Sequence, residues 1–109
     1  MPSFSKNDIV LIRYPFSEMT GSKVRPAVIL SNPHVTGDYL VAPLTSRIGN
    51  LHTGEFILAN WTSAGLNVPS AVKRGIYTVH SDLILKLVGR LSSRDSQQLE
   101  AAIKQWLDF

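Results

Sequence analysis

The stretch PAVILS, residues 26–31, decides the fold of this chain of 109 residues. Its central residues are all apolar, and no polar residue alternates with them, which is typical of a strand buried on both faces. Pro26 restricts the backbone where the strand begins and biases the residue before it toward an extended conformation. The stretch therefore predicts an interior strand without a solvent-facing side.

Other stretches around it are predicted as strands because apolar and β-branched residues are bounded there by Pro, Gly, Asn or Asp. They are IVLIRY at 9–14, YLVAP at 39–43, GEFILA at 54–59 and ILKLVGRL at 84–91, and residues 71–80 are also β-rich. We expect an exposed loop at 16–24, a connector with a brief helical turn at 60–70, and a bulge or bend at Gly89. This number of short strands predicts a small barrel or sandwich.

The C-terminal segment has the pattern of an amphipathic helix. Ser92 is a candidate N-cap, and Asp95 follows at the spacing of a capping box. Apolar residues then recur at helical spacing: Leu99, Ala102, Ile103, Trp106 and Leu107. We expect this stripe to lie against the barrel, with polar residues facing outward: Gln98, Glu100 and Lys104.

The composition is that of one soluble globular domain over residues 1–109, with 44% hydrophobic and 17% charged residues. The chain has no cysteine, which excludes disulfides, iron–sulfur clusters and thiolate zinc sites. Its longest apolar runs are far shorter than the roughly 20 residues that span a bilayer. The first residues lack the apolar stretch of a signal peptide. We expect a cytoplasmic protein without membrane association.

The charge is mildly basic and unevenly distributed. Eleven Lys and Arg residues against eight Asp and Glu residues leave a net charge of +3. Residues 1–90 hold nine of the basic side chains and five of the acidic ones. A basic body of this kind suits an anionic partner.

Several classes of site are missing from the sequence. It contains neither of the glycine-rich phosphate-binding motifs, GxGxxG and GxxxxGK[ST], and no GxSxG nucleophile motif. His34, His52 and His80 stand far apart and lack the spacing of metal ligands, so we interpret them as surface or loop residues. We expect no metal and no cofactor.

Three polar segments remain as candidate sites. In GSKVRP, residues 21–26, Arg25 stands on a stiff loop–strand junction, and its planar, permanent charge suits bidentate recognition of a phosphate. In PLTSR, residues 43–47, two hydroxyls and a cation follow a strand. In SAVKRG, residues 70–75, two cations enter a strand. The alternatives are a surface arginine beside a proline, a Ser/Thr turn that satisfies its own backbone, and a solvated strand edge, respectively.

Taken in order, these segments resemble the MazF/PemK family of toxins from type II toxin–antitoxin systems. The most specific match is Gly-x-x-x-Arg-Pro at residues 21–26, before the aliphatic strand. Pro-x-Thr-Ser at residues 43–46 is the second. Weaker collinear matches extend the resemblance over residues 7–107.

The resemblance implies a mainly β fold, a compact SH3-like barrel with a C-terminal amphipathic helix, assembled as a homodimer. It also implies a ribosome-independent, metal-independent endoribonuclease that cuts single-stranded RNA at short sequences. The expected products carry a 2′,3′-cyclic phosphate and a 5′-OH. The implied partner is a cognate antitoxin whose acidic, initially disordered segment occupies the RNA groove.

Residue by residue, Arg25 and Thr45 match the functional arginine and threonine of the family. The neighbouring polar residues are predicted to contact the RNA backbone: Ser22, Lys23, Ser46, Arg47, Lys73 and Arg74. An arginine with a pKa above about 12 is a poor general base. Relatives often have an acid shortly after the segment that matches Val72–Lys73, where this chain has Arg74 and Gly75. His80, His34 or a water molecule are therefore the candidate proton handlers.

Two other functions compete with RNA cleavage. A catalytically quiet relative would only bind RNA or its antitoxin, as the departure at Gly75 suggests. A related branch of the same fold inhibits DNA gyrase through a C-terminus resembling Trp-Gly-Ile. The present chain ends WLDF at residues 106–109, which does not match that branch.

Overall fold

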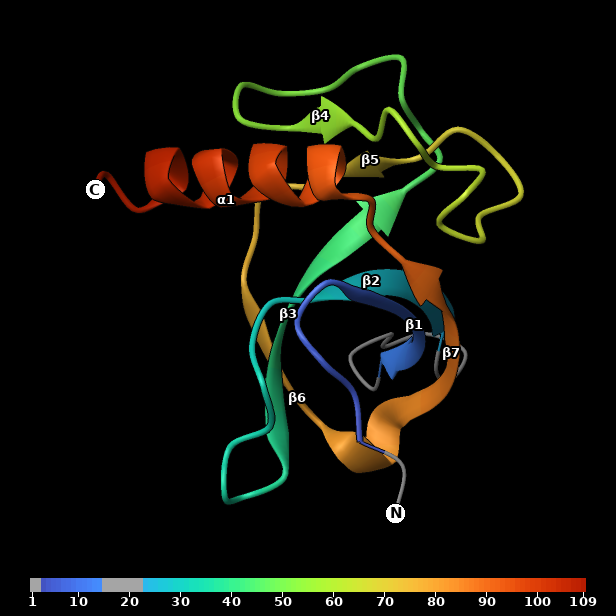
Figure 1. Ribbon diagram of the computed structural model, residues 1–109, viewed down its shortest axis with the longest axis vertical. Helices are drawn as coiled ribbons and strands as arrows, with labels where there is room; N and C mark the ends of the chain where they lie inside the picture. Colours follow the sequence, from blue (N-terminus) through green and yellow to red (C-terminus); the bar gives the residue numbers. More distant parts are fainter. Residues whose placement is uncertain (1–2, 15–22) are drawn as a thin grey trace.

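The computed structural model describes residues 3–14 and 23–109 (Figure 1). Their elements, in chain order, are β1 (Asp8–Tyr14), β2 (Lys23–Ile29), β3 (Asp38–Thr45), β4 (Phe56–Ile57), β5 (Ala71–Val72), β6 (Tyr77–His80), the 3-10 helix η1 (Ser81–Leu83), β7 (Ile84–Arg90) and α1 (Ser93–Trp106). Most of the loop expected at residues 16–24 lies outside the described residues, and its last two residues belong to β2.

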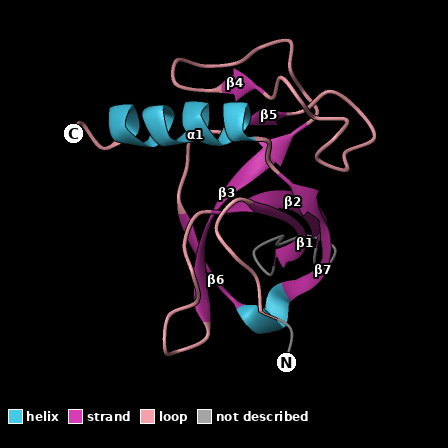
Figure 2. Cartoon of the chain, viewed as in Figure 1, coloured by secondary structure: helices cyan, strands magenta, loops and turns pink. Residues whose placement is uncertain are grey.

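The strands form one antiparallel sheet in the order β4-β5-β3-β2-β1-β7, and β6 also pairs with β3. In addition to β2, strand β3 pairs with two other strands: its first half pairs with β6 and its last two residues pair with β5. The sheet curves on itself around the lower part of the molecule, while α1 lies across the upper part beside β4 and β5 (Figure 2). The predicted fold class, mainly β with a C-terminal helix, is confirmed.

Two hydrophobic clusters occupy the two faces of this sheet. The helix-side core lies between the sheet and α1 and consists of Ile9, Val28, Ala42, Leu44, Leu58, Ala64, Val72, Leu91 and Leu99. The barrel core fills the curved side and consists of Val10, Ile12, Ala27, Ile29, Tyr39, Val41 and Val79. Along β2, Ala27 and Ile29 belong to the barrel core and Val28 to the helix-side core, because successive side chains of a strand point to opposite faces. The prediction of a strand buried on both faces is confirmed.

Helix α1 begins as expected. Ser92 is the N-cap, and its Oγ accepts a hydrogen bond from the N–H of Asp95 at 3.2 Å. The apolar stripe packs on the helix-side core through Leu99, and through Ile103 and Trp106 further along. Leu107 does not continue the stripe, because the helix ends at Trp106, and its side chain is 49% exposed.

Three other expectations were only partly correct. The stretch at 54–59 contributes just the two-residue strand β4, and residues 71–80 divide into β5 and β6, which pair with different ends of β3. The connector at 60–70 contains turns without a helix, and Gly65 adopts a φ of 91°, which a helix does not allow.

The bulge expected near Gly89 is confirmed. The pairing of β1 with β7 steps from Ile9↔Gly89 to Val10↔Leu87, which leaves Val88 as the extra residue. A Cβ atom at Gly89 would collide with the carbonyl oxygen of Ala64, so the bulge brings β7 against the connector. Among the described residues, no helix is both long enough and apolar enough to cross a membrane.

Candidate nucleic-acid interface

A groove with a volume of about 1450 Å³ opens where β1, β2 and β3 extend beyond the barrel core. The buried Ile12 and Val79 of that core form part of its floor. One wall comes from the connector, at Gly65 to Val68, and another from the middle of β7, at Lys86 and Leu87. The groove is therefore built from segments that are distant in sequence and meet at one end of the barrel.

Strand alternation brings Arg25 and Thr45 into this groove. Arg25 lies two residues before Ala27 of the barrel core, and Thr45 lies four residues after Val41 of the same core. Side chains at even spacing along a strand point to the same face, so both residues belong to the face of the barrel core. The last recorded pair of β2 and β3 is Ala27↔Pro43, and two further residues along each strand lead to Arg25 and Thr45. Both line the groove. The sequence could suggest each residue, but only the register places them at the same end.

The hydroxyl of Thr45 is already oriented by its own backbone. Its Oγ1 accepts a hydrogen bond from the N–H of Arg47 at 3.0 Å, which is the Ser/Thr turn considered from the sequence. A hydroxyl has one proton and two lone pairs, so this contact uses an acceptor site and leaves the proton available to a ligand. The turn and the ligand-binding interpretation are thus compatible.

The groove is strongly cationic. Six basic side chains line it: Arg13, Lys23, Arg25, Arg47, Lys73 and Lys86. Within the described part of the chain, no Asp or Glu side chain is among the lining residues. A concave site with charges of one sign concentrates ligands of the opposite sign. A net charge of +3 gave only a hint of this, because it does not show where along the fold the described cations gather.

The structure brings most of the predicted contact residues together. Lys23, Ser46, Arg47 and Lys73 all line the groove with Arg25 and Thr45. Ser22 lies outside the described residues. Arg74 is not among the lining residues; its backbone N–H instead donates to Oε2 of Glu55 at 3.1 Å.

Sequence reasoning missed two of the cations. Arg13 lies near the end of β1 and Lys86 in the middle of β7, both within stretches that were predicted only as strands. The two strands pair with each other, which carries both cations to the groove. A prediction of strand pairing would have been needed to find them.

The carboxylate of Glu55 lies outside the groove lining and is held by backbone groups. The N–H of His52 donates to its Oε1 at 2.8 Å, and this bond is the largest cause of a pKa lowered from the usual 4.5. The bond from Arg74 and the positive charges of His52 and Lys73 act in the same direction, while desolvation opposes them. Glu55 therefore stays ionised at neutral pH and supports the loop before β4.

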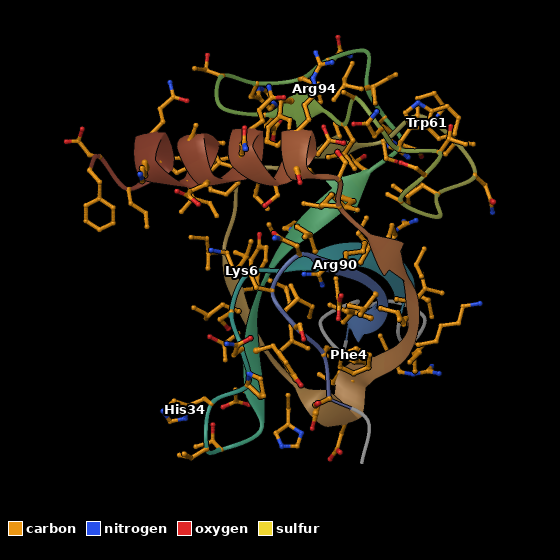
Figure 3. All side chains as sticks on the ribbon, viewed as in Figure 1. Phe4, Lys6, His34, Trp61, Arg90 and Arg94 are labelled. Carbon is orange, nitrogen blue, oxygen red and sulfur yellow. The ribbon has the colours of Figure 1, made fainter. Side chains whose placement is uncertain are left out.

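The two candidate histidines lie at the other end of β3. His80 pairs with Asp38, the first residue of β3, whereas Thr45 is the last of its eight residues. At about 3.3 Å per residue this separates the two ends by about 23 Å. Nδ1 of His80 accepts the N–H of Asp82 at 3.1 Å, and His34 lies in the adjoining loop (Figure 3). Neither imidazole lines the groove.

A buried carboxylate fixes the wall formed by the connector. Asp95 is fully buried, and its two oxygens accept hydrogen bonds from the N–H groups of Ala59 at 2.8 Å and Asn60 at 2.9 Å. Ser92 Oγ also bonds to Oδ1 of Asn60 at 2.8 Å. The capping-box spacing had pointed to Asp95, but its carboxylate holds the connector through these two bonds. Helix α1 therefore holds the segment that continues into the groove wall.

The curved antiparallel sheet, covered on one face by α1 and open at one end onto a cationic groove, places the protein in the class of small, mainly β proteins with a C-terminal helix. The chain belongs to the family of PemK-like, MazF-like toxins of type II toxin–antitoxin systems, whose model matches residues 5–107. The resemblance noted in the sequence is thus confirmed.

Individual relatives agree with this assignment. The chain is 31% identical over 94 residues to endoribonuclease MazF9 of Mycobacterium tuberculosis, a match covering 78% of this chain and 79% of the relative. The solved structure of MazF from Deinococcus radiodurans superimposes with a TM-score of 0.77 at 19% identity and covers 100% of both chains. An endoribonuclease from a mycobacterial species, solved in complex with its cognate antitoxin, gives a TM-score of 0.75 at 17% identity, covering 100% of this chain and 97% of that one.

Proposed function

We propose that this toxin is a sequence-specific, metal-independent and ribosome-independent endoribonuclease that cuts single-stranded mRNA in the cytoplasm. The observation that supports the proposal is that Arg25 and Thr45 lie at the same end of the paired strands β2 and β3 and line one cationic groove. The name of the relative MazF9 supports the same activity.

The reaction requires little chemistry from the protein, because RNA carries its own nucleophile. The 2′-OH beside the scissile phosphate attacks phosphorus, the bond from phosphorus to the 5′ oxygen breaks, and the products are a 2′,3′-cyclic phosphate and a 5′-OH. Holding the 2′-OH in line and stabilising the charge on the phosphoryl oxygens are the two contributions a groove can make.

The roles of the two residues follow from their chemistry. The guanidinium of Arg25 is planar and permanently charged, so it binds the non-bridging oxygens as their charge develops. The Thr45 hydroxyl donates a hydrogen bond to one of these oxygens. Its O–H group is available for this, because the hydroxyl uses only a lone pair to accept the N–H of Arg47. Lys23, Arg47 and Lys73 hold the flanking phosphates.

The proton of the 2′-OH has no acceptor among the carboxylates or imidazoles, because none lines the groove in residues 3–14 and 23–109. We assign its removal to a water molecule, and a proton from solvent completes the 5′-OH. The same observation favours a second candidate function, in which the groove binds RNA without cutting it.

One assay separates the two functions. Purified protein is incubated with a long single-stranded RNA in EDTA, and the fragments and their end groups are analysed. Discrete fragments with 2′,3′-cyclic phosphate ends, which disappear in Arg25→Ala and Thr45→Ala, are expected. Intact RNA together with tight binding would instead establish the quiet relative, and neither cutting nor binding would contradict both.

We further propose that the toxin works as a homodimer. Val68 and Leu87 at the margin of the groove are 49% and 54% exposed, and a second copy would cover such apolar side chains. Light scattering should give a mass of about 24 kDa, twice the 12.0 kDa of the chain. A mass near 12 kDa at micromolar concentration would contradict the dimer.

The proposed protein partner is a cognate antitoxin with an acidic segment that competes with RNA for the cationic groove. The support comes from the groove's charge and from the related endoribonuclease solved with its antitoxin. Expression without the antitoxin should arrest growth of the host, and co-expression should restore it. Normal growth at confirmed expression would count against the toxin.

A further inference from the structure

One side chain that lines the groove is aromatic. Tyr77, the first residue of β6, is 50% exposed and lines the groove, and it is the only aromatic residue among the described lining residues. Tyr77 pairs with Val41 of β3 and lies two residues before Val79 of the barrel core, so its side chain belongs to the same face of the sheet. It lies at the open end of that core.

The ring of Tyr77 packs against the backbone of Gly75. A Cβ atom built on Gly75 would lie 3.1 Å from Cε2 of Tyr77 and 3.3 Å from its Oη, so the ring lies directly against the bare backbone there. A larger residue at position 75 would displace the ring.

Among the described side chains, none forms an aromatic pair with the ring of Tyr77. The one ring pair recorded for the described residues joins Phe4 and Tyr39, with ring centroids 5.9 Å apart. No hydrogen bond of the Tyr77 hydroxyl is recorded within that part of the chain either. An aromatic side chain that is half exposed, packed against the backbone on one side and located in a groove lined by cations has the features of a base-stacking platform.

We propose that Tyr77 stacks on a base of the bound single-stranded RNA; the inference rests on the proposed function and assigns one of its RNA contacts. Lysines and arginines hold the phosphates and do not distinguish one nucleotide from another. A ring binds a base face instead, and it orders the nucleotide so that the phosphate beside it is placed reproducibly.

The stacked base flanks the cut. Tyr77 is opposite Val41, and Thr45 lies four residues further along β3, a separation of about 13 Å along the strand. A base at Tyr77 therefore belongs to a nucleotide beside the scissile step. Replacing the ring should weaken binding of the RNA and leave the products of cleavage the same.

The test measures binding of a labelled oligonucleotide of 2′-O-methyl nucleotides, which lacks the attacking hydroxyl. Its sequence is the one that the wild-type protein cuts or protects in a long RNA. Tyr77→Leu should bind about tenfold or more weakly, which is the effect of losing one stacked base. Tyr77→Phe should stay within about twofold. Leu40→Ala is the control, because Leu40 is exposed on β3 but does not line the groove.

An abasic scan identifies the stacked base, because its first comparison removes bases from the RNA and uses the wild-type protein. Each base of the oligonucleotide is removed in turn, and one flanking position should weaken wild-type binding to the level of Tyr77→Leu. On that abasic oligonucleotide, the wild type and Tyr77→Leu should bind equally. Thermal unfolding checks that the variants are folded.

Three results would overturn the inference. Tyr77→Leu could bind as tightly as the wild type, Tyr77→Phe could lose as much as Tyr77→Leu, or no abasic position could remove the difference between ring and leucine. The second result would mean that the Tyr77 hydroxyl, and not the ring, contributes to RNA binding. If Tyr77→Leu lost antitoxin binding but kept RNA binding, the ring would contact the protein partner and not the RNA. A wild-type protein that binds no RNA defeats the proposed function as well, whereas wild-type cutting with any of the three results defeats only the stacking.

Discussion

The two sides of the sheet differ in how their polar side chains are paired. On the side of α1, the polar groups that reach the helix-side core are paired: Asp95 with two backbone N–H groups, and Trp106 Nε1 with the carbonyl of Gly54 at 2.8 Å. At the open end of the barrel core, six cations share a groove with no described acid. The same alternating strands build both sides. One side supplies stability, and the other forms the groove that we propose binds RNA.

The largest expected effect is on the groove side. Arg25→Ala should lower the rate of RNA cleavage about 10³-fold, because a charge-stabilising group is lost from the transition state. The midpoint of thermal unfolding should change little, since Arg25 is exposed. Single-turnover cleavage of a long RNA in EDTA measures the rate.

Arg94→Ala is the matched control for this prediction. It removes the same charge from the exposed surface of α1, and Arg94 does not line the groove (Figure 3). Its cleavage rate should stay within twofold of the wild type at physiological salt. Equal losses in both variants would mean that only net charge matters.

The opposite result is expected on the helix side. Asp95→Ala leaves two backbone N–H groups near α1 without an acceptor, so the free energy of unfolding should fall by about 3 kcal/mol. For a domain of this size the unfolding midpoint drops by about 10–20 °C. Glu100→Ala, on the exposed face of the same helix, should change the stability by less than about 0.5 kcal/mol. A stable Asp95→Ala protein would show that other contacts hold the connector.

Thr45→Val tests the hydroxyl of the groove with little change in shape. Cleavage should slow about 10²-fold, as is typical when one hydrogen-bond donor to a developing charge is removed. Thr45→Ser keeps the hydroxyl and the acceptor for the Arg47 N–H, so it should restore most of the rate. A serine variant as slow as the valine variant would assign the effect to the methyl group.

The smallest effect concerns pH and Glu55. Because its pKa is lower in the folded chain than the usual 4.5, the ionised form stabilises the fold above that pH, and this contribution is lost as the pH falls through the folded-state pKa. Glu55→Gln should therefore be slightly less stable than the wild type at pH 7 and equally stable at low pH. Urea unfolding at both pH values measures the difference. A constant difference across the range would contradict this linkage.

The sequence predicted the parts of the fold that local patterns determine. The apolar stretches gave β1, β2, β3 and β7 to within a few residues, and the Ser92 cap with its apolar stripe gave α1. It overestimated the strand at 54–59, because β4 is defined only by its two pairs with β5, and local composition does not specify a partner. The two cores on opposite faces of β2 followed from its uninterrupted apolar run.

The site was predictable only as separate residues. The family motifs pointed to Arg25 and Thr45, but their meeting depends on the β2–β3 register, which is a non-local property. Arg13 and Lys86 were missed for the same reason. The histidines were plausible by chemistry alone, and the distance of His80 from Thr45 follows from its pairing at the first residue of β3.

The most direct measurement is an NMR titration of the protein with the uncleavable 2′-O-methyl oligonucleotide. Amide shifts should concentrate at the lining residues Lys23, Arg25, Lys73, Tyr77 and Thr78 and at residues 44–47, and should be small along residues 93–106 of α1. Largest shifts on the helix side, with the groove residues unchanged at saturating RNA, would contradict the assignment of the two faces.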